Sequence, residues 1–425
     1  MTWKTTNTAK GDNKLYSDAK GVVPSLDLRF AEGKNLNDYM TGQNLITFSR
    51  PVGANQSPGT YVDENGIIQL SSADQPRFDH DPTTGESLGL LIEESRTNLL
   101  TYSSNHQQDI THNFLNGFTS TVHTKVTNID PPVEGDEVWI IENQGSNDFA
   151  IKSDDSTQSG YVSYTIFLKR YDSDTVNIKS HFGGIVGTFN LVNGTFTNGG
   201  YGVQMLPYSN GWYKIIWTRD YSSQSRQTGI TIEPNSSAGV YVSGTQIEVG
   251  PFPTSYIPTT TTALTRSADA ASITGSNFSS WYNQSEGTVF GEFSQYAPGG
   301  KVFTISDNTA VNFITVQTNS IVQKAASANV FVSSSNIGRI DSVAAFVANS
   351  TIKFAHGVSN GYRALSAQGE TAVTAANPPT LPVVDTMYLG ANDSGVATFS
   401  NGTISRLTYF PDRLPDAILQ AITAS

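Results

Sequence analysis

The sequence predicts an all-β fold of two antiparallel β-sandwich (jelly-roll) domains, with an extended N-terminal segment and a short C-terminal helix. Three observations lead to this class. The chain has 425 residues, which is more than one hydrophobic core usually serves. Only 15% of the residues are charged, and abundant Ser, Thr, Asn and Gly favour short strands joined by polar turns. Apolar runs of strand length recur with turn residues between them.

Charge and cysteine content exclude several classes of function. The chain has 25 basic and 37 acidic residues and a net charge of −12, so we expect neither nucleic acid nor an anionic lipid surface as a partner. Absence of cysteine excludes disulfides, thiolate metal sites and a cysteine nucleophile. No apolar run has the length of a signal-peptide core or a membrane span. We therefore expect synthesis in the cytoplasm without a signal peptide, and no membrane insertion.

The first two segments differ in their apolar content. Residues 1–24 form a polar arm, which is expected to need a partner before it becomes ordered. Residues 25–104 form an entry segment rich in hairpin signals, of which Asn65-Gly66 between two strand-like runs is the clearest.

Residues 105–258 are predicted to form the first sandwich, because alternating apolar and polar positions recur there at strand length. In the run YVSYTIFLKR, one strand face is apolar and consists of Val162, Tyr164, Ile166 and Leu168. Phe167 is the exception on the opposite, polar face. Trp212 and Trp217 lie in a similar pattern and are expected to fill the core.

Residues 259–271 are predicted to be a linker, because the prolines and the threonine tract around them are incompatible with a central strand or a helix. Residues 272–425 repeat the strand-and-turn pattern and are predicted to form the second sandwich. The tail is predicted to be a short amphipathic helix that starts at Pro415 and turns one face to the sandwich, namely Ile418, Leu419 and Ile422.

Three groups of motifs resemble phage virion proteins. The run GLLIEESRTNLLTYS (89–103), preceded by ENGIIQL and PRFDHDP, resembles a segment of phage tail and virion-surface proteins. NGWYKIIWT and GTQIEVGPFPTSYIPT, followed by Thr265, Arg266, Ala268 and Asp269, resemble the end of a carbohydrate-binding-module-like jelly roll. SSWYNQSEGTVFGEF, MYLGAND and FSNGTISRLTYFPDRLPD resemble a laminin-G or concanavalin A-like sandwich.

The resemblance implies a structural protein of a phage virion, either a tail fibre or a capsid-surface fibre, whose lectin-like domains attach to host-surface glycans. It implies other virion proteins of capsid or tail and host cell-surface polysaccharide as partners, and the virion surface as the location. A homo-oligomer is expected, with a trimer favoured, and residues 1–24 are a candidate virion anchor. Two alternatives remain open: a purely architectural decoration or cement protein, and a glycan-degrading enzyme.

The two adjacent glutamates of the 89–103 run raise the question of acid–base catalysis. Adjacent residues of a strand point to opposite faces, so Glu93 and Glu94 are not expected to converge on one substrate. Glu94 and Arg96 share a face and are expected to pair. We interpret Glu94, Arg96 and Asn98 as a structural joint that leads into the first sandwich.

Glu286 and Glu292 form a second carboxylate pair that could be a candidate for glycan hydrolysis. Glu286 and Glu292 share a strand face, but six residues of strand separate them by about 20 Å, whereas hydrolysis by two carboxylates needs roughly 5–9.5 Å. The sequence therefore predicts no catalytic residues and no enzyme.

Binding candidates are few. Asn392 and Asp393 lie in a loop that resembles the calcium loops of lectin-like sandwiches, although such a loop is more often an ordinary turn, and no cofactor is otherwise expected. Tyr201, Tyr208 and Tyr221 lie in Gly-, Ser- and Asn-rich loops and are the candidates for stacking on a sugar.

Overall fold

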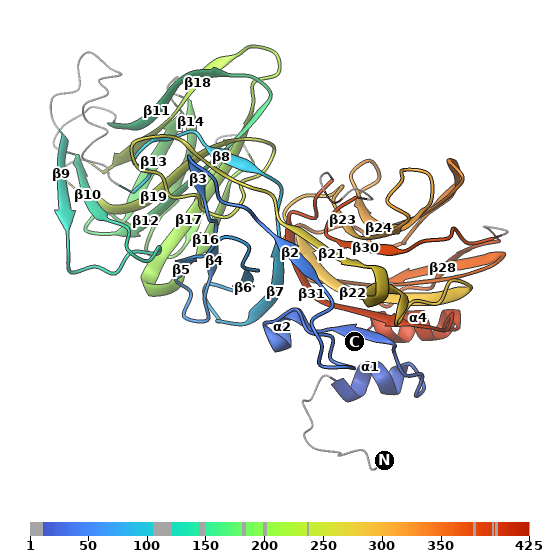
Figure 1. Ribbon diagram of the computed structural model, residues 1–425. Helices are drawn as coiled ribbons and strands as arrows, with labels where there is room; N and C mark the ends of the chain where they lie inside the picture. Colours follow the sequence, from blue (N-terminus) through green and yellow to red (C-terminus); the bar gives the residue numbers. More distant parts are fainter. Residues whose placement is uncertain are drawn as a thin grey trace.

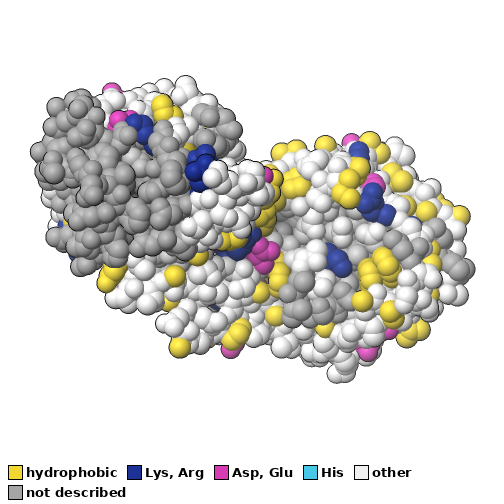
Figure 2. Space-filling view, turned by 90° about the horizontal axis from the view of Figure 1, so that it is seen from above, with side chains coloured by type: hydrophobic (Ala, Val, Ile, Leu, Met, Phe, Trp, Pro, Cys, Tyr) yellow, Lys and Arg dark blue, Asp and Glu magenta, His cyan; other side chains and the backbone are white. Residues whose placement is uncertain are grey.

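The structure, a computed structural model, describes residues 12–424 except 105–120, 144–148, 181–183, 199–201, 236–237, 377–379, 393–394 and 396–397. Strands account for 48% of the residues and helices for 7%, which confirms the predicted all-β class. Figure 1 shows two sandwiches side by side, with strands from the N-terminal part of the chain between them. Figure 2 shows basic and acidic side chains meeting at the waist between the two bodies. None of the helices in the described residues has the length and apolar character of a membrane span.

The first sandwich consists of two antiparallel sheets that pack face to face. Within the described residues, its six-stranded sheet has the order β16 (Gln204–Pro207), β17 (Trp212–Asp220), β12 (Tyr161–Arg170), β19 (Gly239–Val249), β10 (Val138–Asn143) and β9 (Thr121–Val126). Its five-stranded sheet has the order β11 (Phe149–Gln158), β18 (Arg226–Pro234), β13 (Thr175–Ser180), β14 (Ile185–Asn190) and β15 (Thr195–Asn198).

The second sandwich is larger and draws strands from both ends of the chain. Over the described ranges, its eight-stranded sheet has the order β29 (Val373–Ala375), β28 (Tyr362–Ala367), β27 (Ile352–Ser359), β22 (Glu286–Gln295), β31 (Gly402–Phe410), β7 (Ser87–Ile92) and β6 (Phe78–His80), with β1 (Leu26–Leu28) also on β31. The facing seven-stranded sheet has the order β2 (Thr47–Ser49), β21 (Ala270–Thr274), β30 (Thr386–Leu389), β23 (Lys301–Ser306), β24 (Phe313–Asn319), β25 (Lys324–Val332) and β26 (Ser335–Asp341).

Short elements complete the molecule. The small sheets are β3 (Gln56–Ser57), β20 (Leu264–Arg266) and β8 (Arg96–Asn98) in one group, and β4 (Thr60–Val62) with β5 (Ile68–Leu70) in the other. The helical elements are α1 (Asp12–Asp18), α2 (Phe30–Gly33), the 3-10 turn η2 (Ser209–Gly211), α3 (Gly275–Ser279) and α4 (Asp416–Thr423).

The first sandwich is an insertion into the second. Four strands of the predicted entry segment, β1, β2, β6 and β7, lie in the sheets of the second sandwich. The predicted linker contains β20, which pairs antiparallel with β8, and the start of β21. The chain therefore leaves through β8 and returns through β20, so the prolines and threonines before Leu264 occupy the return path and the ladder begins after them.

Strands β12 and β17 are buried on both faces. Tyr164 and Trp217 lie in the core between the two sheets of the first sandwich, with ring centroids 4.9 Å apart. Phe167 and Trp212 point the other way, into an apolar cluster that includes Val62 of the entry segment. Both tryptophans are buried, as predicted, and the Phe167 exception is explained because the entry segment covers the second face of this sheet.

The C-terminal helix α4 covers the eight-stranded sheet, and its buried face contains Ile418, Leu419 and Ile422, as predicted. Helix α1, within the predicted N-terminal arm, packs on the same apolar cluster through Leu15 and Ala19. The Tyr16 hydroxyl donates a 2.6 Å hydrogen bond to the Asp27 carboxylate. Residues 12–19 of the arm are therefore attached to the second sandwich.

A buried ionic cluster lies where the two sandwiches meet. From here on this cluster is called the joint, and it does not include Glu94, Arg96 or Asn98, which were predicted to form a structural joint. It consists of three guanidiniums and two carboxylates, all with fully buried side chains: Arg50, Arg77, Arg266, Glu93 and Asp269. Asp269 accepts from Arg50 at 2.8 Å and from Arg77 at 2.6 Å. Burial alone would raise the pKa of Glu93, but the charges of Arg266 and Arg77 and hydrogen bonds from Ser255 lower it to about 2.

Removing one charge from the joint should destabilise the protein strongly. In Asp269→Asn, three buried guanidiniums face a single carboxylate, and breaking a buried ion pair typically costs about 3–5 kcal/mol. We expect a loss of that size in the free energy of unfolding, measured by urea denaturation. The control is Asp174→Asn, which removes an exposed pair with Arg170 and should cost less than about 1 kcal/mol. Equal effects of the two substitutions would show that the joint is not a stabilising centre.

Candidate binding pocket between the sandwiches

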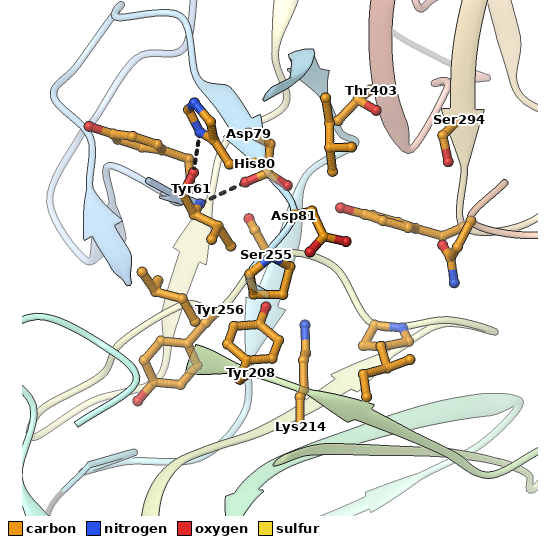
Figure 3. Close-up of a pocket in the computed structure, with 18 of the residues that line it drawn as sticks. Tyr61, Asp79, His80, Asp81, Tyr208, Lys214, Ser255, Tyr256, Ser294 and Thr403 are labelled. Atoms are coloured by element: carbon orange, nitrogen blue, oxygen red, sulfur yellow. Dashed lines mark hydrogen bonds between the residues drawn. The ribbon is translucent and has the colours of Figure 1, made fainter. Parts of the chain in front are cut away.

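A cavity of about 390 Å³ lies between the two sandwiches and the entry segment. Its lining comes from β4, β5 and β6, from β16 and β17, from residues 252–256, and from the second sandwich at Ser294, Tyr296 and Thr403. The volume falls in the range of about 300–1,000 Å³ that small-molecule sites occupy. Figure 3 shows side chains from these separate parts of the chain around one space.

The wall from the first sandwich is one face of β17. Alternation sends Ile215 and Trp217 into the sandwich core and leaves Lys214 and Ile216 on the cavity face. The Lys214 ammonium makes no hydrogen bond or ion pair with any described residue. Burial lowers the pKa of Lys214, while the charges of Glu248, Glu93 and Asp79 oppose this shift.

Two tyrosines add hydroxyl groups to the cavity. Tyr208 lies beside β17, where its backbone N–H donates to the carbonyl of Trp212 at 2.8 Å and its ring meets the Phe167 ring edge-on at 5.2 Å. Tyr296 enters from the second sandwich, with its ring 6.3 Å from that of Phe252. Burial raises the pKa of both tyrosines, so their hydroxyls stay protonated and act as hydrogen-bond donors.

The entry segment contributes carboxylates. Asp79 accepts a 2.6 Å hydrogen bond from the Val62 N–H, and His80 Nδ1 lies 2.8 Å from the Val62 carbonyl (Figure 3). Burial raises the pKa of Asp79 to about 6, and this outweighs the opposing hydrogen bond from Val62. For Asp81, hydrogen bonds from Thr83 and Thr84 overcome the effect of burial and lower the pKa.

Ser255 connects the cavity to the joint. Its backbone N–H and hydroxyl each donate to the Glu93 carboxylate at 2.7 Å, and Arg77 donates to its hydroxyl at 2.8 Å. Ser255 also lines the cavity. One wall of the cavity is therefore fixed by the hydrogen bonds that tie Ser255, at the end of the first sandwich, to the joint.

Glu94, Arg96 and Asn98, which were predicted to form a structural joint, lie outside the ionic cluster and contact both sandwiches. Glu94 forms an ion pair with Arg96, and its backbone N–H donates to the Asn401 side chain at 2.9 Å. Asn98 donates to the carbonyls of Thr245 and Ile257, and its side-chain oxygen accepts from two backbone N–H groups. A side chain at Gly250, whose φ is +149°, would collide with the Arg96 guanidinium.

Of the three predicted sugar-stacking tyrosines, the two that the structure describes lie in different places. Tyr208 lines the cavity. Tyr221 is 6% exposed and hydrogen-bonds the Tyr164 hydroxyl at 3.0 Å within the first core, so its expected exposure is not found. Tyr201 lies outside the described residues, as does Asp393 of the calcium candidate. Asn392 is described and half-buried, and no group of three metal-ligating side chains occurs among the described residues.

Glu286 and Glu292, the second carboxylate pair, both lie on β22 and contact different residues. Glu286 accepts a hydrogen bond from the Arg413 N–H at 3.1 Å, and Glu292 lies 4.0 Å from the Lys353 ammonium. Neither residue lines the cavity described above.

Sequence reasoning missed three cavity residues: Asp79, Lys214 and Tyr296. The signal for Lys214 was present, because a lysine flanked by Tyr213 and Ile215 on a two-sided buried strand is unusual. Asp79 lies in the PRFDHDP motif, which was used only for the resemblance. Tyr296 carries no local signal, since its position depends on the second sandwich meeting the entry segment.

No family model matches the chain, and no curated protein does. Among solved structures, the chain is similar to the Ruminococcus gnavus IT-sialidase CBM40 bound to α2,3-sialyllactose, at 18% identity and a TM-score of 0.31, over 34% of this chain and 84% of that one. Domains LG4-5 of the mouse laminin α1 chain are similar at 12% identity and a TM-score of 0.23, over 68% of this chain and 90% of that one. Trypanosoma rangeli sialidase in complex with the inhibitor DANA is similar at 9% identity and a TM-score of 0.27, over 72% of this chain and 53% of that one. Similarities of this size assign no function to the chain.

The stability of the protein should depend on pH through Asp79. Its folded-state pKa of about 6 lies above the ordinary value of 3.8, so the folded protein holds this proton more tightly than the unfolded chain. The free energy of unfolding therefore falls as pH rises through this window. We expect Asp79→Asn, which keeps an acceptor for the Val62 N–H, to raise the Tm at pH 8 and to lose this advantage at pH 4.

The exposed carboxylate of Asp412 provides the control substitution, Asp412→Asn. A Tm difference between Asp79→Asn and the unsubstituted protein that is the same at pH 4 and pH 8 would contradict the assignment. The comparison needs only thermal unfolding of the full chain at the two pH values.

Proposed function

We propose that the chain is a structural protein of a phage virion surface, and that it binds a host-surface glycan in the cavity between its two sandwiches. The observation that carries this proposal is the cavity itself, which combines aromatic rings with hydrogen-bond donors and acceptors. Sugars present hydroxyl groups at their edges and C–H groups on their faces. The tyrosine hydroxyls, Lys214 and Asp79 suit the edges, and the rings of Tyr208, Phe252 and Tyr296 suit the faces.

The virion role is supported by the motifs that resemble phage proteins and by the position of their charged residues in the joint. The joint contains Arg77 of PRFDHDP, Glu93 of the 89–103 run, and Arg266 and Asp269 of the predicted linker. The shared motif is thus explained by a rigid connection between two sandwiches, which suits a projecting structural component. A homo-oligomer, with a trimer favoured, would raise the avidity of one modest site by repetition.

An architectural role without glycan binding is the second candidate. It is favoured because the motif residues whose contacts are known, Arg77, Glu93 and Asp269, stabilise the molecule and do not line the cavity. A glycan-degrading activity is the third candidate, and new reducing ends released from host polysaccharide would reveal it.

Closing the mouth of the cavity should abolish glycan binding. Gln204 is exposed on the edge strand β16 and lines the cavity, so Gln204→Trp should fill the entrance without disturbing the core. We expect at least about a tenfold loss of affinity for host envelope polysaccharide, in a binding assay with the full chain.

The matched control is Thr197→Trp, on the exposed edge strand β15 of the same sandwich. It adds the same ring away from the cavity and should leave the affinity unchanged. Absence of binding to any host polysaccharide by the unsubstituted protein would refute glycan attachment and favour the architectural role.

The anchor proposal for residues 1–24 can be tested without disturbing the fold. Deleting residues 1–11 retains α1 and the Tyr16–Asp27 hydrogen bond, so the Tm should not change. We expect the shortened chain to be lost from assembled particles, measured by its copy number in purified virions. Normal incorporation of the shortened chain would exclude residues 1–11 from the anchor.

A further inference from the structure

The donors and the acceptors that line the cavity differ in their hydrogen bonding to the protein. Three donors that line it, the Lys214 ammonium and the hydroxyls of Tyr208 and Tyr296, make no hydrogen bond with any described residue. The carboxylates that line it already accept bonds from the protein. Asp79 accepts from Val62, and Asp81 accepts from Thr83 and Thr84. No described acceptor lies at hydrogen-bond distance from these three donors.

From this imbalance we propose that the ligand is an anionic saccharide, in which a carboxylate or phosphate group pairs with Lys214 and accepts from Tyr208 and Tyr296. The inference rests on the proposed glycan-binding function and specifies its ligand class. An ammonium partly withdrawn from water is costly unless it is paired, so a site that keeps one unpaired is suited to an incoming anion.

The carboxylates around Lys214 are engaged elsewhere. Glu93 is bonded to Ser255 and Arg77. Glu248 accepts from the Thr254 N–H at 2.9 Å and from its hydroxyl at 2.6 Å. Neither forms an ion pair with Lys214 among the described residues. Lys214 thus has acidic neighbours at longer range and, among the described residues, no partner at hydrogen-bond distance.

The wall behind the cavity also favours an anion. The joint contains three guanidiniums and two carboxylates, so it carries one positive charge in excess. Ser255 lies between the joint and the cavity, and Arg77 donates to its hydroxyl. This excess positive charge offsets part of the negative charge of Asp79 and Asp81, which line the cavity.

Figure 3 shows Lys214 and Tyr208 directing their polar ends into the cavity from the first sandwich, with Asp81 on the wall toward the entry segment. Bonds from Thr83 and Thr84 hold the Asp81 carboxylate in its own turn. An anionic group that approached β17 would meet the ammonium, while neutral hydroxyls of the same sugar would face Asp79 and Asp81.

The test compares matched saccharides on the full chain by calorimetry. The probes are trigalacturonate, the same trisaccharide with its carboxyl groups reduced to alcohols, and galactose 6-phosphate beside galactose. We expect at least one anionic probe to bind about tenfold or more tightly than its neutral counterpart, because hydrogen bonds to charged groups are the stronger ones. The carboxylate and phosphate arms show which anion the site takes.

Lys214→Gln should remove the preference for the anionic probe, whereas Lys14→Gln, at an exposed lysine of α1, should leave it intact. If Lys214→Gln fails to fold, Tyr296→Phe keeps the ring and should weaken binding of the anionic probe more than of the neutral one. Equal affinity for charged and neutral probes would overturn this inference and leave glycan binding standing. Failure of every saccharide to bind would overturn both.

Discussion

The two sandwiches depend on one buried group of charges. Arg50, Arg77, Arg266, Glu93 and Asp269 pair with one another, and Ser255, which follows the last strand of the first sandwich, donates to Glu93. Removing one partner would leave an unpaired buried ion, which costs roughly 3–5 kcal/mol. The residues come from the entry segment, the end of β7 and the return path, which places the joint where the inserted sandwich leaves and rejoins the chain. Folding of the insertion and completion of the second sandwich are thereby coupled.

This coupling also defines the cavity. The space exists because the entry segment covers the outer face of β12 and β17, while the second sandwich closes the far side. Its shape is held through Ser255, which bonds both Glu93 and Arg77. A binding site between two bodies is usually mobile, but one fixed to a dense ionic cluster keeps its donors in place before a ligand arrives, which lowers the ordering cost of binding.

The sequence predicted the class, the strand pattern and the C-terminal helix, because these depend on local alternation and turn chemistry. It did not predict the insertion topology, since pairing of β7 with β31 joins residues about 300 apart and leaves no mark on either strand alone. The cavity was missed for the same reason, as Asp79, Lys214 and Tyr296 become neighbours only after that pairing. Phe167 was a local sign that the entry segment covers this sheet, because it is an apolar residue on the polar face of a strand that has two buried faces.

Because side chains alternate along an extended chain, the adjacent residues Glu93 and Glu94 make contacts in two different places. Because neighbouring side chains leave an extended chain on opposite sides, Glu93 reaches the joint and Ser255, while Glu94 reaches Arg96 and, through Asn401, the loop before β31. The alternation that prevents the two carboxylates from acting on one substrate lets them hold both sides of the waist at once. A single charged residue in this place could satisfy one side only, and the other side would keep a buried guanidinium without a carboxylate. The doublet is therefore required by the architecture, and the ligand chemistry is left to Lys214 and the tyrosines across the cavity.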